Sequence, residues 1–265
     1  MGVAREKLLS LLPPRARLEL RWARIRAEQS FGRRYSTRRR AEKVRRSVGV
    51  LFLRGHGIEV GALHRPVRLP HGTSVRYVDR YSRESLREHY PELAHERLVA
   101  VDVLDDGEAL STIPDGSLDF VIANHFIEHC EDPLGTVATH LRKLGPDGVL
   151  YYCIPDRCAT VDRKRSVTPF EHLLEDHREG PGHSRRAHYG EWARLVLGLP
   201  EAEAEAEADR LMADGYSIHF HVWDADALYE FVRRLRLDLG LGLRLELLLH
   251  NDNEIILVLR RYPPR

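Results

Sequence analysis

The chain has 265 residues, of which 43% are hydrophobic and 31% charged, a balance that predicts one globular domain with elaborations or at most two small domains. The sequence contains no run of about 18 apolar residues, so we expect no membrane-spanning helix. The first residues also lack the apolar core and cleavage site of a secretory signal. Cys130, Cys153 and Cys158 show neither metal-ligand spacing nor a disulfide framework, which favours a reducing, cytoplasmic location.

The net charge of +1 conceals an uneven distribution along the chain. Residues 1–47 hold fifteen Lys or Arg and four Asp or Glu, a local charge of +11, and the remaining residues carry −10. Leu18, Trp22, Ile25 and Phe31 recur here at roughly helical spacing, so we expect a basic helical arm. Such an arm suits contact with nucleic acid, an anionic membrane surface or an anionic substrate. The alternative, which we favour, is a solvated helix that covers the core or pairs with a second copy in a homodimer.

From residue 48 onward, short apolar segments alternate with helical patterns. Segment 117–126 is almost wholly apolar, as a strand buried on both faces of a sheet should be. Segment 132–145 has the signals of a helix, with Asp132 as N-cap, Pro133 in the first turn and Gly145 as its stop. This alternation predicts a doubly wound α/β fold with a mostly parallel sheet. The predicted strands are 57–60, 75–80, 97–104, 117–126 and 148–156, and the predicted helices are 82–90 and 132–145.

Residues 157–222 interrupt the alternation with a segment rich in His, Arg, Pro and Gly. A long insertion after a strand is usually functional, so we expect a cap that binds the substrate. Within it, 201–209 predicts a solvated acidic helix, because its glutamates wrap around a helix instead of lining one face. Residues 224–240 predict a capped amphipathic helix, followed by two strands joined by a turn at 250–253. The predicted division is an arm of 1–47 and a domain of 48–265 with the insertion 157–222.

The ligand of such a sheet binds beyond the carboxyl ends of its strands. The loop "GIEVGALHRP" at 57–66 has Gly61 as its one internal glycine, whereas a pyrophosphate needs three glycines and an intact helix N-terminus. An adenosine ligand without phosphate demands less, namely one close backbone approach and a carboxylate for the ribose. Asp79 supplies that carboxylate near the roughly 20-residue offset from the glycine loop that is typical of such acids. Glu59 either orients the loop or faces a cationic ligand.

Several short motifs occur in a fixed order along 57–156. They are "GIEVGALHRP", "VRYVDR", "DGSLD" with the "EH" that follows the fourth predicted strand, and "LRKLGPDGVLYYCIPD". Together they resemble the motifs of class I S-adenosylmethionine-dependent methyltransferases, whose first motif is an acidic residue followed by Gly-x-Gly. The resemblance implies a seven-stranded Rossmann-like sheet that ends in an antiparallel hairpin. Leu63 departs from the family pattern, because a second glycine would stand there.

The resemblance also implies S-adenosylmethionine as the cofactor. A metal is not required for this chemistry, although Mg²⁺ serves some small-molecule methyltransferases and the sequence leaves its use open. No spacing of His, Cys, Asp or Glu specifies a metal site, so we predict none. The predicted cofactor-binding residues are Glu59, Gly61, Ala62, Asp79, Arg80, Asp105, Asp106, Gly107, Asn124 and His125.

Methyl transfer needs alignment of the acceptor and removal of its proton. Histidine is the natural base near neutral pH, and the predicted catalytic residues are His125, His129, His188 and His221. His183 and His219 are further candidates, although any single histidine is more often structural. Tyr189 and Trp192 either line the acceptor pocket or pack in the core.

Three functions remain open on the sequence. The favoured one is O-methylation of a small-molecule or sugar-like acceptor in a biosynthetic pathway. An RNA or protein methyltransferase would use the arginine-rich arm, but the chain has no recognisable RNA-binding module. A methyltransferase-like binding module without activity is the third.

Overall fold

The computed structural model describes residues 35–90, 93 and 95–263, together with residues 16, 20 and 23. Most of the predicted arm lies outside these residues, so its contacts with nucleic acid or a second copy stay predictions. Its described part is helix α3 (Tyr35–Phe52), which continues through the expected boundary at residue 48. In the part of the chain that the structure describes, no helix is long and apolar enough to cross a membrane.

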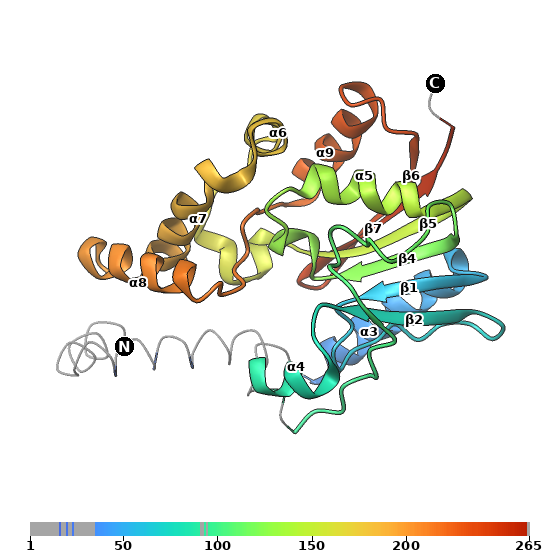
Figure 1. Cartoon of the computed structure of the whole chain (residues 1–265), viewed down its shortest axis with the longest axis horizontal. Coiled ribbons are helices and arrows are strands. Elements are labelled where there is room, and N and C mark those ends of the chain that lie inside the picture. The colour runs from blue at the N-terminus through green and yellow to red at the C-terminus, as the bar shows by residue number, and fades with distance from the viewer. Residues whose placement is uncertain are drawn as a thin grey trace.

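One seven-stranded sheet forms the centre of the described chain (Figure 1). The strands are β1 (His56–Val60), β2 (Ser74–Asp79), β3 (Val103–Leu104), β4 (Leu118–Asn124), β5 (Leu144–Pro155), β6 (Leu243–Asn251) and β7 (Glu254–Arg261). Their order is β3-β2-β1-β4-β5-β7-β6, and β7 alone among them runs opposite to the others. The predicted mostly parallel sheet with a C-terminal antiparallel hairpin is therefore confirmed. The strand order reverses between β1 and β4, the place where such sheets bind ligands.

Strand β3 is much shorter than the predicted strand 97–104. The carboxylate of Asp102 accepts a hydrogen bond from the backbone N–H of Tyr77 at 2.8 Å. A side chain thus takes a donor on β2 that a longer neighbouring strand would have used. The backbone of Val99 turns instead to the loop after β1, where its N–H donates to the carbonyl of Leu63 at 2.8 Å. The prediction was wrong for residues 97–102 because periodicity does not reveal this competition.

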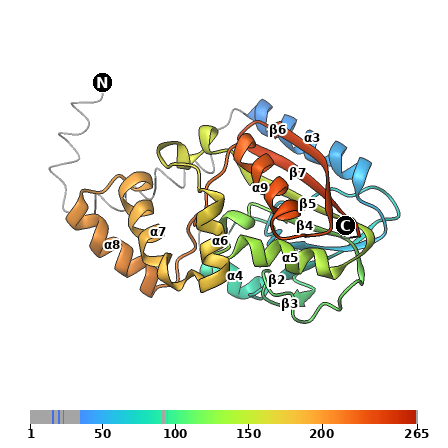
Figure 2. The ribbon, with the colours of Figure 1, turned by 90° about the horizontal axis from the view of Figure 1, so that it is seen from above.

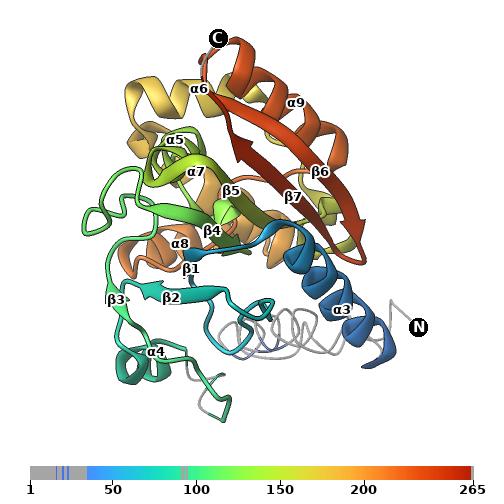
Figure 3. The same cartoon turned by 90° about the vertical axis from the view of Figure 1, so that its right-hand side faces the viewer.

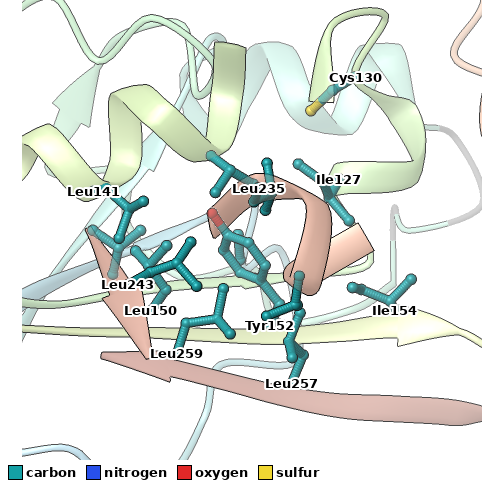
Figure 4. Packing of buried hydrophobic residues seen from close by; sticks show 14 of the residues in the cluster. Ile127, Cys130, Leu141, Leu150, Tyr152, Ile154, Leu235, Leu243, Leu257 and Leu259 are labelled. Atoms are coloured by element: carbon teal, nitrogen blue, oxygen red, sulfur yellow. The ribbon is translucent and has the colours of Figure 1, made fainter. Parts of the chain in front are cut away.

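Helices cover both faces of the sheet. On one face, α5 (Pro133–Lys143) and α9 (Ala225–Leu237) pack on apolar side chains of β4, β5 and β7. Figure 4 shows the ring of Tyr152 pointing from β5 into this layer, close to Leu235 and Leu257. On the opposite face, α3 contributes Val48 to a second cluster that includes Phe120. Figure 3 shows α3 separated from α5 and α9 by the strands.

The predicted helix starts are confirmed, but the predicted stop at Gly145 is wrong, because α5 ends at Lys143 and Gly145 lies in β5. Helix α4 (Arg83–His89) begins after Ser82, whose side chain accepts a hydrogen bond from the N–H of Ser85. Asp132 and Asp224 cap α5 and α9 in the same way. Strand β5 begins directly after α5, earlier than the predicted residue 148. The short caps fix where each helix begins, and hence which residues lie at the ends of the strands.

Residues 157–222 form a cap beyond the carboxyl ends of the parallel strands (Figures 1 and 2). Its helices are α6 (Phe170–Glu179), α7 (Arg185–Glu191), which continues into a π-helical turn, and α8 (Glu201–Ala213). The cap has an apolar core of its own, so the predicted solvated helix 201–209 is only partly solvated: Ala204 and Ala208 are fully buried in it. The chain returns toward the sheet at Phe220, whose N–H donates to the carbonyl of Glu128 at 2.8 Å.

Candidate functional site

The carboxyl ends of β1 to β4 bring the predicted cofactor residues to one edge of the sheet. The N–H of Gly61 donates to the carbonyl of Val78 at 3.0 Å, which joins the first loop to the end of β2. The N–H of Asp105 donates to the carbonyl of Asp79 at 3.1 Å, which joins β2 to the loop after β3. Asn124 ends β4 beside β1. Residues far apart in sequence thus meet because parallel strands end together.

The loop after β1 turns through two left-handed residues. Gly61 has φ 62° and Leu63 has φ 49°. Leu63 therefore adopts a left-handed backbone conformation that a glycine would adopt more easily, because a side chain makes it less favourable. The carbonyl of Ala62 accepts from the N–H of Arg65 at 2.9 Å, which closes the turn. A methyl group added at Gly61 would meet only Phe126, at 4.0 Å, so the space in front of this glycine is open.

Glu59 holds the rest of this loop in place. The side chain is 1% exposed, and both carboxylate oxygens accept from the N–H of Val67 at 3.1 Å. The amide nitrogen of Asn124 lies 3.3 Å from Oε1 of the same carboxyl. Burial raises the pKa of Glu59 to about 8, although the hydrogen bond from Val67 opposes this shift. These contacts match the loop-orienting interpretation, since the carboxyl is turned to the protein.

Asp79 and Arg80 lie where β2 ends. Oδ1 of Asp79 accepts from the N–H of Tyr81 at 3.2 Å, and the side chain is only half-buried. Partial burial raises the pKa of Asp79 above its usual value. The guanidinium of Arg80 is exposed and lies over the ring of Tyr81, 5.1 Å from its centroid. Of the two, Asp79 has the position and the chemistry to accept hydrogen bonds from a ribose.

The acidic side chains after β3 form hydrogen bonds within their own turn, so they shape the site and do not face the ligand. The carboxylate of Asp105 accepts from Thr112, and that of Asp106 accepts from Glu108, so both stabilise their own turn. Gly107 packs so closely that an added methyl group would lie 2.4 Å from Val60 and within 3.0 Å of the Phe126 ring. We identify Phe126, which no sequence signal singled out, as the apolar wall shared by both glycine turns.

A buried histidine on α5 fixes the Gly107 turn from behind. Nε2 of His140 lies 2.7 Å from the carbonyl of Gly107, and Nδ1 lies 2.6 Å from the hydroxyl of Tyr152. A carbonyl only accepts, so Nε2 carries the hydrogen and Nδ1 accepts from the tyrosine. Burial lowers the pKa of His140 to about 4, which keeps the ring neutral. His140 thus supports the Gly107 turn without facing the ligand. Its position on α5 is an ordinary helical one, and the sequence did not indicate this role.

His125 stands between two buried carboxylates. Its Nε2 lies 2.9 Å from Glu254 and its Nδ1 lies 3.4 Å from Glu128. Burial would lower its pKa, but the hydrogen bonds to Glu128 and Glu254 outweigh burial and raise it. Glu254 is also paired with Arg45 of α3, whose Nε and Nη2 each donate to one carboxylate oxygen, and it accepts from Asn251 at 2.6 Å. These contacts hold the pKa of Glu254 far below its usual value despite burial.

His129 lies in the loop after β4 against the returning end of the cap. Its Nδ1 lies 2.8 Å from the carbonyl of Ile218 and 3.0 Å from the hydroxyl of Ser217. The carbonyl can only accept, so Nδ1 carries the hydrogen and Nε2 keeps a lone pair. Burial and the neighbouring His219 lower the pKa of His129 to about 4, so the ring is neutral.

His219 belongs to a buried ionic network inside the cap. Its Nδ1 lies 2.6 Å from Asp162, which also accepts from Arg165 at 2.9 Å. Arg165 also donates to Glu191 and to the carbonyls of His219 and Phe220. His183, in contrast, is exposed, and its Nδ1–H donates to the carbonyl of Gly180 in its own turn at 2.7 Å. The Nδ1 atoms of both histidines are therefore engaged within the cap itself.

His188 and His221 lie together in the cap, apart from the cofactor loops. Their ring centroids are 5.1 Å apart, and His172 and Asp176 of α6 complete the group. Tyr189, with its hydroxyl donating to the carbonyl of Tyr216, lies in the apolar core of the cap. Trp192 lies in the same apolar core, so for both aromatic residues the packing interpretation holds.

The sequence missed the partners that give these histidines their character. Arg45 and Glu254 are 209 residues apart in the chain, and nothing local in their segments marks them as a pair. Asp162 and Arg165 stand in a short polar stretch that resembles a surface turn. The one local signal available was the spacing of His172 and Asp176, which places both on one face of a helix.

The strand order, the glycine turn after β1 and the acidic residue ending β2 define an α/β fold that binds a nucleoside at the carboxyl ends of its strands. Residues 38–237 match the model of a methyltransferase domain, and because the match spans most of the sequence, the chain belongs to this family. It is an enzyme of the S-adenosylmethionine-dependent methyltransferases, as the motifs predicted.

Solved structures of the same class resemble the chain in fold. An S-adenosylmethionine-dependent methyltransferase from Thermotoga maritima, described as a possible histamine N-methyltransferase, is 15% identical over 89% of this chain and 97% of its own, with a TM-score of 0.47. One from Mesorhizobium loti is 13% identical over 83% and 98%, with a TM-score of 0.47. One from Aquifex aeolicus is 14% identical over 83% and 88%, with a TM-score of 0.44. No curated protein matches the sequence.

Proposed function

We propose that the enzyme methylates a hydroxyl of a small, sugar-like acceptor held between the loop after β4 and the cap, with His129 as the general base. The single observation that carries this assignment is the tautomer of His129, fixed by the carbonyl of Ile218 so that Nε2 keeps its lone pair. The cap residue Ser217 lies beside the same ring, so the base stands at the junction of sheet domain and cap.

The residues at the strand ends fit the cofactor. The space in front of Gly61 is open, which suits close approach of a ligand to the backbone. Oδ1 of Asn124 is buried without a hydrogen-bond partner among the described residues, and a polar group of the ligand would satisfy it. Asp79 would hold the ribose hydroxyls, Phe126 would border the adenosine, and Glu59 would keep the loop in place. Ala62, Arg80, Asp105, Asp106 and Gly107 would shape the rim.

The other histidines suit a base less well. Both ring nitrogens of His125 face carboxylates, and its raised pKa favours the imidazolium form, which has no lone pair. His188 and His221 belong to the cap group described above, where Nε2 of each faces the buried carboxylate of Asp176. His129 is neutral at physiological pH, which a base must be before it accepts a proton.

In the proposed reaction, the cofactor and the residues of the chain have separate roles. S-adenosylmethionine supplies, when bound, a methyl group on a positively charged sulfur that leaves as a neutral thioether. His129 Nε2 accepts the proton of the acceptor hydroxyl as the oxygen attacks, and His125, with its flanking carboxylates, holds positive charge at the strand edge. The cap, residues 157–222, excludes water from the acceptor. The free thiols of Cys130, Cys153 and Cys158 support a reducing, cytoplasmic setting for a biosynthetic enzyme.

Acceptor profiling with methyl-labelled cofactor tests the proposal. We expect label in sugar-like hydroxyl compounds, and we expect His129→Gln to lower kcat by roughly 10²- to 10⁴-fold without weakening cofactor binding. The exposed His250, replaced by Gln, serves as the control and should leave kcat unchanged. A His129→Gln enzyme that keeps full kcat would remove the proposed base, and label found only in amines, RNA or protein would remove the proposed acceptor.

A further inference from the structure

Four potential metal ligands converge in the cap. Among the described residues, His172, Asp176, His188 and His221 each offer one ligand atom, and these four atoms all lie within 4.8 Å of one another. His172 and Asp176 are one turn apart on α6, His188 lies on α7, and His221 lies on the segment that returns to the sheet. Three separate pieces of the cap therefore contribute to one point.

The distances within this group match a small coordination sphere. Nε2 of His172 lies 3.0 Å from Nε2 of His188 and 3.2 Å from Oδ2 of Asp176. The Nε2 atoms of His188 and His221 lie 4.0 and 3.9 Å from the same Oδ2. Ligand bonds of about 2.0–2.1 Å in a tetrahedral site place the ligand atoms roughly 3.3 Å apart. Small rotations of these side chains would bring the four atoms to that spacing.

The environment of Asp176 indicates that the group is preformed to bind a cation. Its side chain is fully buried, and Oδ2 points into the histidines without a hydrogen-bond partner among the described residues. Oδ1 is held by the hydroxyl of Ser184 at 2.6 Å, as a carboxylate that ligates a metal is commonly held from behind. A buried carboxylate oxygen without a partner is unfavourable, and a cation at the centre of the group would satisfy it.

From this arrangement we infer that the cap binds one divalent transition-metal ion of the Zn²⁺ type through His172, Asp176, His188 and His221. Three imidazoles with one carboxylate suit Zn²⁺ and its neighbours, whereas Mg²⁺ and Ca²⁺ take oxygen ligands. Four protein ligands fill a tetrahedral sphere, which is the pattern of a structural site. The ion thus joins α6, α7 and the returning segment, and does not depend on the role of His129.

The position of His221 gives the ion a consequence for the enzyme. The backbone N–H of His221 donates to the carbonyl of Glu128 at 3.3 Å, and this carbonyl belongs to the loop after β4. Binding of the ion by Nε2 of His221 would replace the contact of 3.3 Å that this nitrogen makes with the carbonyl of Glu131. A metal that fixes His221 therefore fixes the cap against this loop.

Metal analysis and calorimetry on the full chain test the inference. We expect the metal-free protein to bind one equivalent of Zn²⁺ with a Kd below 1 μM, a threshold about 10³-fold tighter than a 1 mM surface association. Co²⁺ added in its place should give the intense visible absorption of a tetrahedral site. His188→Gln and Asp176→Asn should weaken Zn²⁺ binding at least 100-fold, while His177→Gln, on the same helix but turned to Asp132, should bind as the parent does.

Each result of these experiments either supports the inferred metal site or overturns it. Failure of the parent protein to bind stoichiometric Zn²⁺ overturns the inference whether or not the variants fold, and circular dichroism identifies any variant that does not. Binding that survives His188→Gln but is lost in His219→Gln would place the ion at the second group of potential ligands, Glu128, His129 and His219, and would also overturn it. Chelation should lower the Tm of the parent by several degrees and leave folded His188→Gln unchanged.

Discussion

Single residues at the strand ends carry unusual backbone and charge states. Leu63 holds a left-handed conformation that glycine adopts more easily, and Gly61 two residues earlier holds a similar one. Glu59, behind them, is a buried carboxyl whose pKa is raised to about 8. Each of these states is unfavourable in isolation, and each contributes to the shape of the first loop. Substitutions at these residues therefore test whether each unfavourable state affects cofactor binding, the stability of the fold, or both.

Gly61→Ala should weaken cofactor binding, whereas Leu63→Gly should leave the stability of the protein nearly unchanged. An alanine at Gly61 must adopt a positive φ, which costs about 1–2 kcal/mol, and its methyl group enters the open space proposed for the cofactor. We expect cofactor affinity to fall at least tenfold. Leu63→Gly relieves strain but frees the unfolded chain, so its free energy of unfolding should stay within about 1 kcal/mol of the parent. Thermal unfolding and calorimetry measure both, and unchanged affinity in Gly61→Ala would contradict the proposed cofactor position.

Glu59→Gln should flatten the dependence of stability on pH. The pKa of Glu59 is higher in the folded state, so its contribution is fully present below about pH 4, the unfolded value, and is lost as the pH rises toward 8. The amide cannot ionise, and the variant should gain on the order of 2–4 kcal/mol relative to the parent between pH 5 and pH 9. Urea unfolding at several pH values gives this difference. Parallel pH profiles for the two proteins would show that Glu59 is ionised throughout.

Between elements, a buried ion pair joins Arg45 and Glu254. It ties α3, from the start of the described domain, to the first residue of β7, and Glu254 is completely buried. Because the same carboxylate also faces His125, the position of α3 bears on the charge at the strand edge. Helix α3 is thus part of the catalytic domain's packing.

Arg45→Met should destabilise the protein by about 3–5 kcal/mol, since it leaves a buried carboxylate without its main partner. The double variant Arg45→Met, Glu254→Gln removes the unpaired charge and should recover a large part of that loss. Chemical unfolding of the two single variants and the double variant gives the coupling. Additive effects in this cycle would mean that the two side chains do not interact in solution.

Local signals in the sequence were enough for most elements but not for their partners. Ser82, Asp132 and Asp224 mark helix starts through bonds to residues three positions away, and alternation of apolar segments gave the strands. The shortening of β3 depends on Asp102 and Tyr77, which are 25 residues apart. Likewise the ring of predicted cofactor residues followed from the rule for parallel sheets, whereas the choice among histidines required Ile218, Glu254 and Asp176. Long-range contacts of this kind leave no periodic trace.

At the scale of the whole molecule, α7, α8 and the returning end of the cap have an apolar core of their own, whereas Phe170 and Leu173 of α6 belong to the core on the α5 face of the sheet. The cap core is built around residues such as Tyr189, Leu211 and Phe220, and the cores on the sheet faces contain none of them. The proposed cofactor residues lie on the sheet side, whereas the proposed acceptor lies against the cap. This arrangement predicts that damage to one core has a distinct functional signature.

Leu211→Ala should loosen the cap without disturbing cofactor binding. Leu211 is fully buried in the cap core, and truncation of such a leucine costs about 2–5 kcal/mol. We expect KM for the acceptor to rise while the cofactor Kd is unchanged. Val137→Ala in the core between α5 and the sheet serves as the matched variant and should weaken cofactor binding instead. Equal losses of both ligands in both variants would show that the cores behave as one unit.

The place of β7 has a consequence for how the protein is made. This strand is the last in chain order yet lies inside the sheet, and its residues Ile255–Leu259 are completely buried. Its partner β5 ends at Pro155, so at a synthesis rate of about 5–20 residues per second the ribosome needs roughly 5–20 s more to deliver β7. For that interval the nascent chain carries an apolar strand with one open edge, a template for association with other chains. Folding of the enzyme in the cell therefore depends on protection of β5 until synthesis reaches β7.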